Sequence, residues 1–229
     1  MFYYDSTMIL IIIGAGIAFL AQSLMQRAYK KYAQVRARSG VTGAQVAQAL
    51  LKESGIDDVQ IVRIAGNLTD NFNPDTRVLS LSQGVHDGNS IAALGVAAHE
   101  CGHAMQYHLH YAPLNLRKTI VPSAQIGSQL SWSIFLGGLM FSFRPLILIG
   151  IALYIIAVFF TLVTLPVEFD ASHRALLKLE STGYLAEDEL FGAKKVLKAA
   201  AMTYVAAALS AILQLLRLIM LSNNSRRRD

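Results

Sequence analysis

The segment His99-Glu100-Cys101-Gly102-His103 places two histidines four residues apart, with a glutamate directly after the first. Residues at this spacing lie on one face of an α-helix, so that both imidazoles can bind the same zinc ion. Ser90 is a suitable N-cap, and the segment from Ile91 to Tyr107 is rich in alanine with apolar residues at helical spacing. We therefore expect a buried helix from Ile91 to Tyr107 that carries this motif.

Composition indicates a membrane protein. Charged residues make up only 15% of the 229 residues and hydrophobic residues 54%, which favours several membrane-spanning segments over an ordinary water-soluble domain. The net charge of +5 comes from clustered lysines and arginines, which suits orientation in a membrane and gives no reason to expect a nucleic-acid partner. The one cysteine, Cys101, excludes an internal disulfide.

Four apolar stretches are candidates for crossing the membrane. The first, Thr7 to Met25, carries no charge, and the basic residues near it follow it, so we expect a permanent anchor instead of a cleaved signal peptide. Ile120 to Phe143 and Leu146 to Leu165 should form a helical hairpin around Arg144-Pro145. The fourth stretch runs from about Ala199 to Leu221.

The distribution of positive charge predicts the topology. Residues 26–119 contain ten Lys or Arg and residues 166–198 contain five, so we expect both segments in the cytoplasm and the N-terminus outside. The fourth stretch contains Arg217 and is followed by Arg226, Arg227 and Arg228, so it either crosses the membrane or lies along its surface. Crossing is slightly favoured.

The expected fold is a mainly α membrane protein with three to four transmembrane helices and a small α+β domain. Within that domain, Thr42 to Ser54 should form an amphipathic helix closed by Gly55, and Val59 to Ile64 and Arg77 to Ser82 should be strands separated by a polar loop from Gly66 to Thr76. The expected parts are an N-terminal anchor (1–26), a cytoplasmic segment with the motif helix (27–119), the hairpin (120–165), a second cytoplasmic segment (166–198) and a C-terminal transmembrane or interfacial helix with a basic tail (199–229).

A catalytic zinc ion commonly has three protein ligands, so the two histidines need a partner. The best candidate is Glu168, which follows the third apolar stretch directly, where the hairpin returns the chain to the side that carries the histidines. Asp170 or Ser172 could accept a hydrogen bond from an imidazole, and His173 is a further candidate for a supporting role. We expect one zinc ion near the inner edge of the bilayer, with membrane-embedded or membrane-adjacent peptides as substrates.

Peptide hydrolysis is the chemistry that this residue set favours. Zinc lowers the pKa of a bound water and polarises a carbonyl, and Glu100 would take the proton of that water and later deliver one to the leaving amine. A donor to the oxyanion is also expected, and His173, Arg174 and Asn71 are possibilities that no spacing supports. That role is left unassigned.

Three segments together with the N-terminal anchor resemble the bacterial YugP-type neutral zinc metallopeptidases. They are AAHECGHAMQ (Ala97–Gln106), NPDTRVLSLS (Asn73–Ser82) and LPVEFDASHRAL (Leu165–Leu176). More distantly, the chain resembles the HtpX-type heat-shock membrane proteases and the CAAX prenyl proteases. The resemblance covers nearly the whole chain. It implies a zincin-like (gluzincin) cytoplasmic domain in a bacterial inner-membrane protein, with His99, His103 and Glu168 binding zinc and Glu100 as the catalytic acid and base.

The chain departs from these families at two places. The distant relatives have Glu-x-x-x-Asp, and the position of that aspartate is Ser172 here, so its supporting role would pass to Asp170 or be absent. The closer family tends towards Asp-His-Tyr-Asp-Pro before the second strand, whereas this chain has Asp70-Asn71-Phe72-Asn73-Pro74. A contact from that loop to substrate or metal is therefore not expected.

Two other functions stay open beside an integral-membrane zinc endopeptidase. The first alternative is a non-catalytic scaffold or adaptor whose zinc only stabilises the fold, although structural zinc has no need of Glu100. The second is a transport component, which the scarcity of charge in the apolar stretches disfavours. For Cys101, burial as a small apolar residue is favoured over metal binding, because its position turns it away from the face of the histidines.

Overall fold

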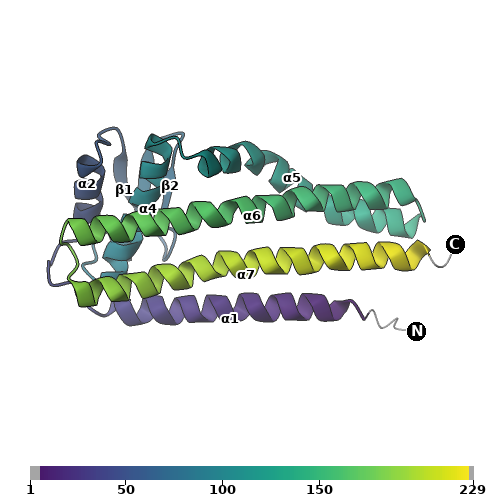
Figure 1. Cartoon of the computed structure of the whole chain (residues 1–229), viewed down its shortest axis with the longest axis horizontal. Coiled ribbons are helices and arrows are strands. Elements are labelled where there is room, and N and C mark those ends of the chain that lie inside the picture. The colour runs from purple at the N-terminus through teal and green to yellow at the C-terminus, as the bar shows by residue number, and fades with distance from the viewer. Residues whose placement is uncertain (1–5, 227–229) are drawn as a thin grey trace. The chain divides into compact units, whose positions relative to one another are not determined.

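The computed structural model describes residues 6–226, and it divides into two compact units. The helical unit comprises Met1–Ala21, Leu116–Leu165 and Thr203–Asp229, and the α/β unit comprises Gln22–Asn115 and Pro166–Met202. Four long helices each contribute residues to both units, and Figure 1 shows them: α1 (Met8–Ala33), α5 (Ala112–Met140), α6 (Arg144–Ser181) and α7 (Glu187–Arg226).

The helical unit is built from parts of these four helices. Small residues allow close contact, since Ser210 Oγ of α7 donates a hydrogen bond to the carbonyl oxygen of Gly14 in α1 at 3.0 Å. The apolar centre is formed by Phe135, Ile147 and Leu218. Arg217 is also buried: its Nε donates to Thr7 Oγ1 at 3.3 Å, and its guanidinium lies over the Trp132 ring, 5.5 Å from the centroid. The arginine in the predicted fourth span therefore points into the unit.

Among residues 6–226, three helices are long and apolar enough to cross a membrane. They are Met8–Ala33, Arg144–Ser181 and Glu187–Asn223, which contain the first, third and fourth predicted stretches. Helix α5, which contains most of the second predicted stretch, is not among them, because serines and glutamines such as Gln125 and Gln129 lower its hydropathy. Arg226 is the last residue of α7, and the predicted tail residues Arg227 and Arg228 lie outside the described residues.

Helix α2 (Gly43–Glu53) of the α/β unit lies at the position predicted for the amphipathic helix. The Thr42 side chain accepts a hydrogen bond from the Gln45 amide, and the Gln45 side chain accepts one from the Thr42 amide, which together form a capping box. After the helix, Gly55 adopts φ = +70°, a conformation that glycine takes without strain. Local sequence therefore determines both ends of α2.

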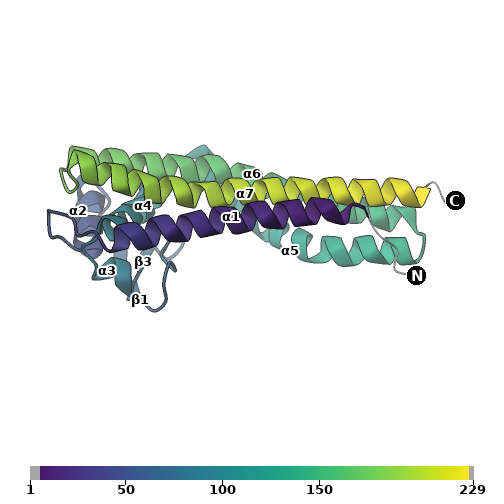
Figure 2. The same cartoon turned by 90° about the horizontal axis from the view of Figure 1, so that it is seen from below.

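The sheet has three strands, β1 (Gln60–Ile64), β2 (Asn71–Asn73) and β3 (Val78–Ser82), in the order β1-β3-β2. β1 pairs with β3 in parallel, and β2 pairs with β3 antiparallel. The two predicted strands are confirmed as β1 and β3, whereas β2 lies inside the predicted loop and α3 (Gln83–His86) was not predicted. Figure 2 shows α3 beside β1 and β3.

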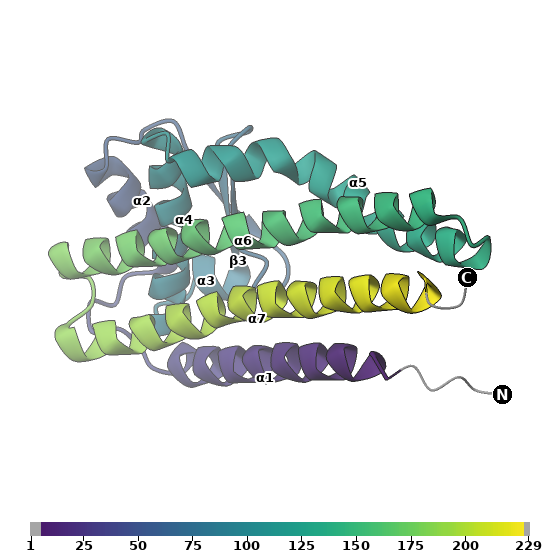
Figure 3. The same cartoon turned by 45° about the vertical axis from the view of Figure 1, so that its right-hand side comes forward.

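Helix α4 (Ile91–His108) is the central element of the α/β unit and confirms the helix predicted for the motif segment. Ser90 caps it by accepting a hydrogen bond from the Ala93 amide at 3.1 Å. Most of its residues are buried, and α4 runs across the part of α6 that belongs to this unit (Figure 3). The core around it includes apolar residues of α2, β3, α4, α6 and α7, among them Leu50, Leu79, Leu94, Leu179 and Leu197.

Candidate metal centre

Helix α4 presents His99 and His103 on one face. The centroids of the two imidazole rings are 4.7 Å apart, and the ring planes are nearly perpendicular, at 80°. Their side chains are 16% and 13% exposed, so both rings are largely shielded from solvent but can still be reached from it. The spacing of the motif therefore brings the imidazoles together as predicted.

Helix α6 supplies Glu168 to the same place. Glu168 Oε2 lies 3.3 Å from His99 Nε2 and 3.6 Å from His103 Nε2, and its side chain is 3% exposed. One ligand atom from each of the three residues lies within 4.8 Å of the others, which forms a group that can hold a metal ion. Residues more than 60 positions apart in the chain are thus brought together at one point.

Gly102, within the motif, lets the backbones of α4 and α6 approach each other closely. A Cβ atom at this position would lie 2.5 Å from the Ala171 carbonyl oxygen and 3.1 Å from the Ala171 Cα. Ala171 is one helical turn after Glu168. The absence of a side chain at Gly102 is therefore a condition for bringing Glu168 to the histidines.

The distances from Glu168 to the two histidine nitrogens fit a shared zinc ion. Zinc binds histidine nitrogen and carboxylate oxygen at about 2.0–2.2 Å, and two such ligands at a tetrahedral angle are about 3.3–3.6 Å apart. The two separations from Glu168 Oε2, 3.3 Å and 3.6 Å, fall in this range. Two imidazoles with one carboxylate are also a ligand set that zinc uses in hydrolases, in which a fourth position is left open.

The other ring nitrogen of each histidine contacts an uncharged side chain. His99 Nδ1 lies 3.2 Å from Ser172 Oγ, and His103 Nδ1 lies 3.0 Å from Gln106 Oε1. In both rings Nε2 therefore faces Glu168, while Nδ1 contacts the supporting side chain, Ser172 or Gln106. This is the arrangement in which supporting residues orient metal-binding imidazoles.

Gln106 is fully buried and connects α4 with α6. Its Nε2 donates hydrogen bonds to the Val167 carbonyl oxygen at 2.7 Å and to Asp170 Oδ2 at 2.8 Å. The same Asp170 oxygen accepts a bond from Arg174 Nε at 2.6 Å. Asp170 thus lies beside the centre but contacts Gln106, and it is Ser172 that contacts an imidazole.

Glu100 is buried next to the two histidines, with 7% of its surface exposed. Burial is the main cause that raises the pKa of its carboxyl group, opposed by His99 and His103, while the charges of Glu168 and Asp70 raise the pKa further. A carboxyl group whose pKa is raised holds a proton more readily than an exposed one, which suits a residue that must both accept and release a proton.

Comparison with known proteins agrees with this geometry. The family described as "Putative neutral zinc metallopeptidase" matches residues 7–223 of the chain. The chain belongs to this family. It is 44% identical over 217 residues to the "Putative membrane protease YugP" of Bacillus subtilis (strain 168). The aligned residues make up 95% of this chain and 96% of that protein. No solved structure matches the chain.

The family membership confirms the resemblance to the YugP-type metallopeptidases that the sequence motifs indicated. The family name implies zinc as the metal, and the His99, His103 and Glu168 group is able to hold a metal ion. The name of the relative and the three apolar helices indicate a protease associated with a membrane. Peptides or proteins are the substrates that such an activity implies.

Several other predicted residues lie apart from the metal-binding group. His173 is exposed, and so is Asn71, the first residue of β2, whose Nδ2 donates to the Thr69 carbonyl oxygen. Cys101 is buried in the core, where its Sγ donates to the Ala47 carbonyl oxygen at 3.6 Å and burial raises the pKa of its thiol. The expectation that Cys101 is a buried small residue is therefore confirmed.

Sequence interpretation missed the contact of Gln106 with His103. The signal that could have found it is the three-residue spacing, because residues three apart on a helix are neighbours on its surface. The bonds from Gln106 to α6 could not be found in this way, since they depend on the packing of α4 against α6.

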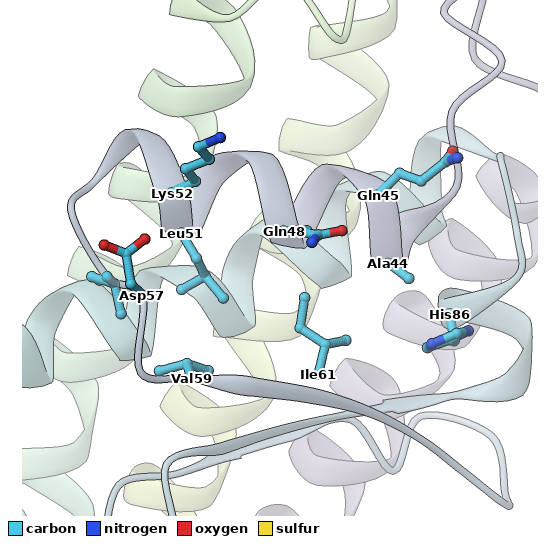
Figure 4. Close-up of a pocket in the computed structure, with 10 residues that line it drawn as sticks. Ala44, Gln45, Gln48, Leu51, Lys52, Asp57, Val59, Ile61 and His86 are labelled. Atoms are coloured by element: carbon cyan, nitrogen blue, oxygen red, sulfur yellow. The ribbon is translucent and has the colours of Figure 1, made fainter.

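A separate groove lies between α2 and β1 (Figure 4). It has a volume of about 420 Å³. The close-up shows Gln48 of α2, Ile61 of β1 and His86 of α3 around this space. None of the residues that line it belongs to the metal-binding group, so the groove and the candidate centre are distinct features of the α/β unit.

Proposed function

We propose that this protein is an integral-membrane zinc metalloendopeptidase that hydrolyses peptide bonds of membrane or membrane-adjacent proteins. The observation that carries the proposal is the convergence of His99, His103 and Glu168 beside the buried carboxyl group of Glu100. Membership of a zinc metallopeptidase family supports the same activity.

In this proposal His99 Nε2, His103 Nε2 and the Glu168 carboxylate hold one zinc ion, in a gluzincin-like arrangement. When bound, zinc supplies a Lewis acid and a water of lowered pKa. Glu100 acts as the proton carrier, accepting a proton on its carboxylate and returning it to the amine that leaves after the peptide bond breaks. Its burial beside the histidines supports this role, because proton transfer needs a carboxyl group held close to the reacting atoms.

The residues behind the histidines would keep the imidazoles in the orientation that binding requires. Ser172 occupies the position at which distant relatives carry an aspartate, and its hydroxyl can accept a hydrogen bond from His99 Nδ1. Asp170 would support His103 indirectly, by accepting a hydrogen bond from Gln106. His173, which is exposed, is left out of this set.

The proposed location is the bacterial inner membrane, with the N-terminus outside and the site at the cytoplasmic face. The excess of lysine and arginine in residues 26–119 and 166–198 supports this orientation. Within the continuous helix α6, Glu168 follows Leu165, the end of the predicted apolar stretch, by three residues or about 4.5 Å of helix. A metal ligand so close to the end of a span favours substrates in or beside the bilayer.

The proposal is tested with Glu100→Gln in detergent-purified protein or nanodiscs. Zinc content by mass spectrometry should be near one ion per chain for both proteins, whereas cleavage of an unstructured peptide or a membrane substrate should be lost in the variant. Glu180→Gln, on an exposed position of α6, is the matched control and should cleave normally. Equal cleavage by the wild type and Glu100→Gln would refute the peptidase mechanism, and zinc binding without any cleavage by the wild type would favour a scaffold.

A further inference from the structure

The side chain of Gln106 can be oriented in only one way. Both partners of its Nε2 atom, the Val167 carbonyl oxygen and the Asp170 carboxylate, can accept hydrogen bonds but cannot donate them. The NH₂ group must therefore face α6, and Oε1 must face His103 Nδ1. If the amide were turned over, its oxygen would lie against two other oxygens.

This orientation determines which nitrogen of His103 carries the proton. Oε1 of Gln106 is an acceptor, so His103 Nδ1 must be the donor, and in the neutral ring Nε2 then has its lone pair free. Nε2 is the atom that faces Glu168. The amide thus selects the form of His103 that can bind a metal ion.

Ser172 cannot impose the same choice on His99. A hydroxyl group both donates and accepts, so Ser172 Oγ can bond to His99 Nδ1 whether or not that nitrogen carries a proton. The two imidazoles are therefore held differently, one by an adaptable hydroxyl and one by an amide of fixed orientation.

We propose that Gln106 is a positioning residue that holds His103 in the Nδ1-protonated form and ties that choice to α6, the helix that carries Glu168. Val167, whose carbonyl oxygen accepts a hydrogen bond from Gln106, directly precedes Glu168 in the chain. The Gln106 amide therefore couples the orientation of His103 to the placement of the Glu168 carboxylate. Asp170 holds the Gln106 amide in this orientation by accepting its hydrogen bond, and Arg174 holds Asp170 in place by donating a hydrogen bond to it. The inference rests on the proposed function in taking His103 as a metal ligand.

The test combines two variants of Gln106 with two readouts. The tautomer of His103 is measured in metal-free, ¹⁵N-histidine-labelled protein that also carries Glu168→Gln, because the Glu168 carboxylate faces His103 Nε2 and would otherwise hold a proton there and charge the ring. The signals are assigned from His103→Asn, and zinc binding is measured with Glu168 intact. The zinc dissociation constant is measured by competition with a chelator. Gln106→Leu should give a mixture of His103 tautomers and weaken zinc binding by about 10–100-fold, the usual effect of losing a residue that supports a ligand. Gln48→Leu, an exposed glutamine in α2, is the control and should change neither readout.

A rescue experiment separates positioning from simple packing. In Gln106→Glu the new carboxylate can accept from His103 Nδ1 but faces the Asp170 carboxylate, so zinc binding should weaken. Adding Asp170→Asn gives that carboxylate an amide donor, while the Val167 carbonyl oxygen still faces it. The double variant should therefore recover the wild-type tautomer and bind zinc more tightly than Gln106→Glu, without reaching the wild-type affinity. This comparison keeps the proposal testable even if Gln106→Leu does not fold.

The possible failures can be told apart. Wild-type tautomer and zinc affinity in Gln106→Leu, or no recovery in the double variant, would overturn the role of Gln106 while leaving the metal site intact. A wild-type protein that binds no zinc would instead refute the proposed function. The His103 tautomer, measured without metal, would then still decide whether Gln106 holds the ring.

Discussion

Replacing Gly102 with alanine should separate Glu168 from the histidines. The added methyl carbon would lie 2.5 Å from the Ala171 carbonyl oxygen and 3.0 Å from its carbonyl carbon. Both are backbone atoms that cannot rotate away, so α4 and α6 must move apart by about 1 Å to reach ordinary van der Waals separation. Metal–ligand distances tolerate only about 0.2 Å, and the shift is therefore large enough to remove Glu168 from the coordination sphere.

Gly95→Ala is the matched control in the same helix. Its Cβ would lie 3.4 Å from the Ala193 Cβ, which is an ordinary contact. Alanine is favoured over glycine inside a helix by about 0.5–1 kcal/mol, so this variant should be at least as stable as the wild type. Gly102→Ala should instead lose about 1–3 kcal/mol of unfolding free energy through overpacking.

Two measurements decide this prediction. Denaturant unfolding of the metal-free proteins gives the stability difference, and chelator competition gives the zinc affinity. We expect Gly102→Ala to bind zinc at least about 100-fold more weakly than the wild type, because losing a ligand should exceed the effect of losing a supporting residue. Wild-type zinc affinity in Gly102→Ala would refute the argument that the close contact of α4 with α6 places Glu168.

Three further predictions concern other parts of the α/β unit. Cys101 should not react with a maleimide in the folded protein, because burial raises the pKa of its thiol and so lowers the thiolate fraction at neutral pH. It should react after unfolding. Rapid labelling of the native protein would contradict its place in the core. Ser90→Ala should lower the unfolding free energy by about 1 kcal/mol through loss of the bond to the Ala93 amide, with Ser181→Ala as an exposed control. Glu168→Gln should keep the fold, as judged by circular dichroism, but lose bound zinc, whereas unchanged zinc content would exclude Glu168 as a ligand.

The elements that the sequence predicts correctly are those that local signals determine. The capping residues Thr42 and Ser90 place the starts of α2 and α4, and the spacing of His99 and His103 puts both rings on one face. The apolar stretches within α1, α6 and α7 follow from composition alone. Each of these features depends on residues within a few positions of one another.

The features that the sequence did not reveal depend on contacts between distant segments. Two of the three residues Asn71–Asn73 are asparagines, which are depleted in strands, and β2 forms because β3 supplies a partner. Helix α6 continues past Pro166 to Ser181, where packing on the core outweighs the hydrogen bond that proline cannot donate. Gln106 contacts Val167 and Asp170, which are 61 and 64 positions away in the chain, so no local pattern indicates these bonds.

The most direct test of the metal site is an experimental structure of the zinc-loaded protein, with the ion located by anomalous scattering at the zinc absorption edge. We expect one ion about 2.0–2.2 Å from His99 Nε2, His103 Nε2 and a carboxylate oxygen of Glu168. An ion bound at another place, or one held by the two histidines with Glu168 beyond coordinating distance, would contradict it.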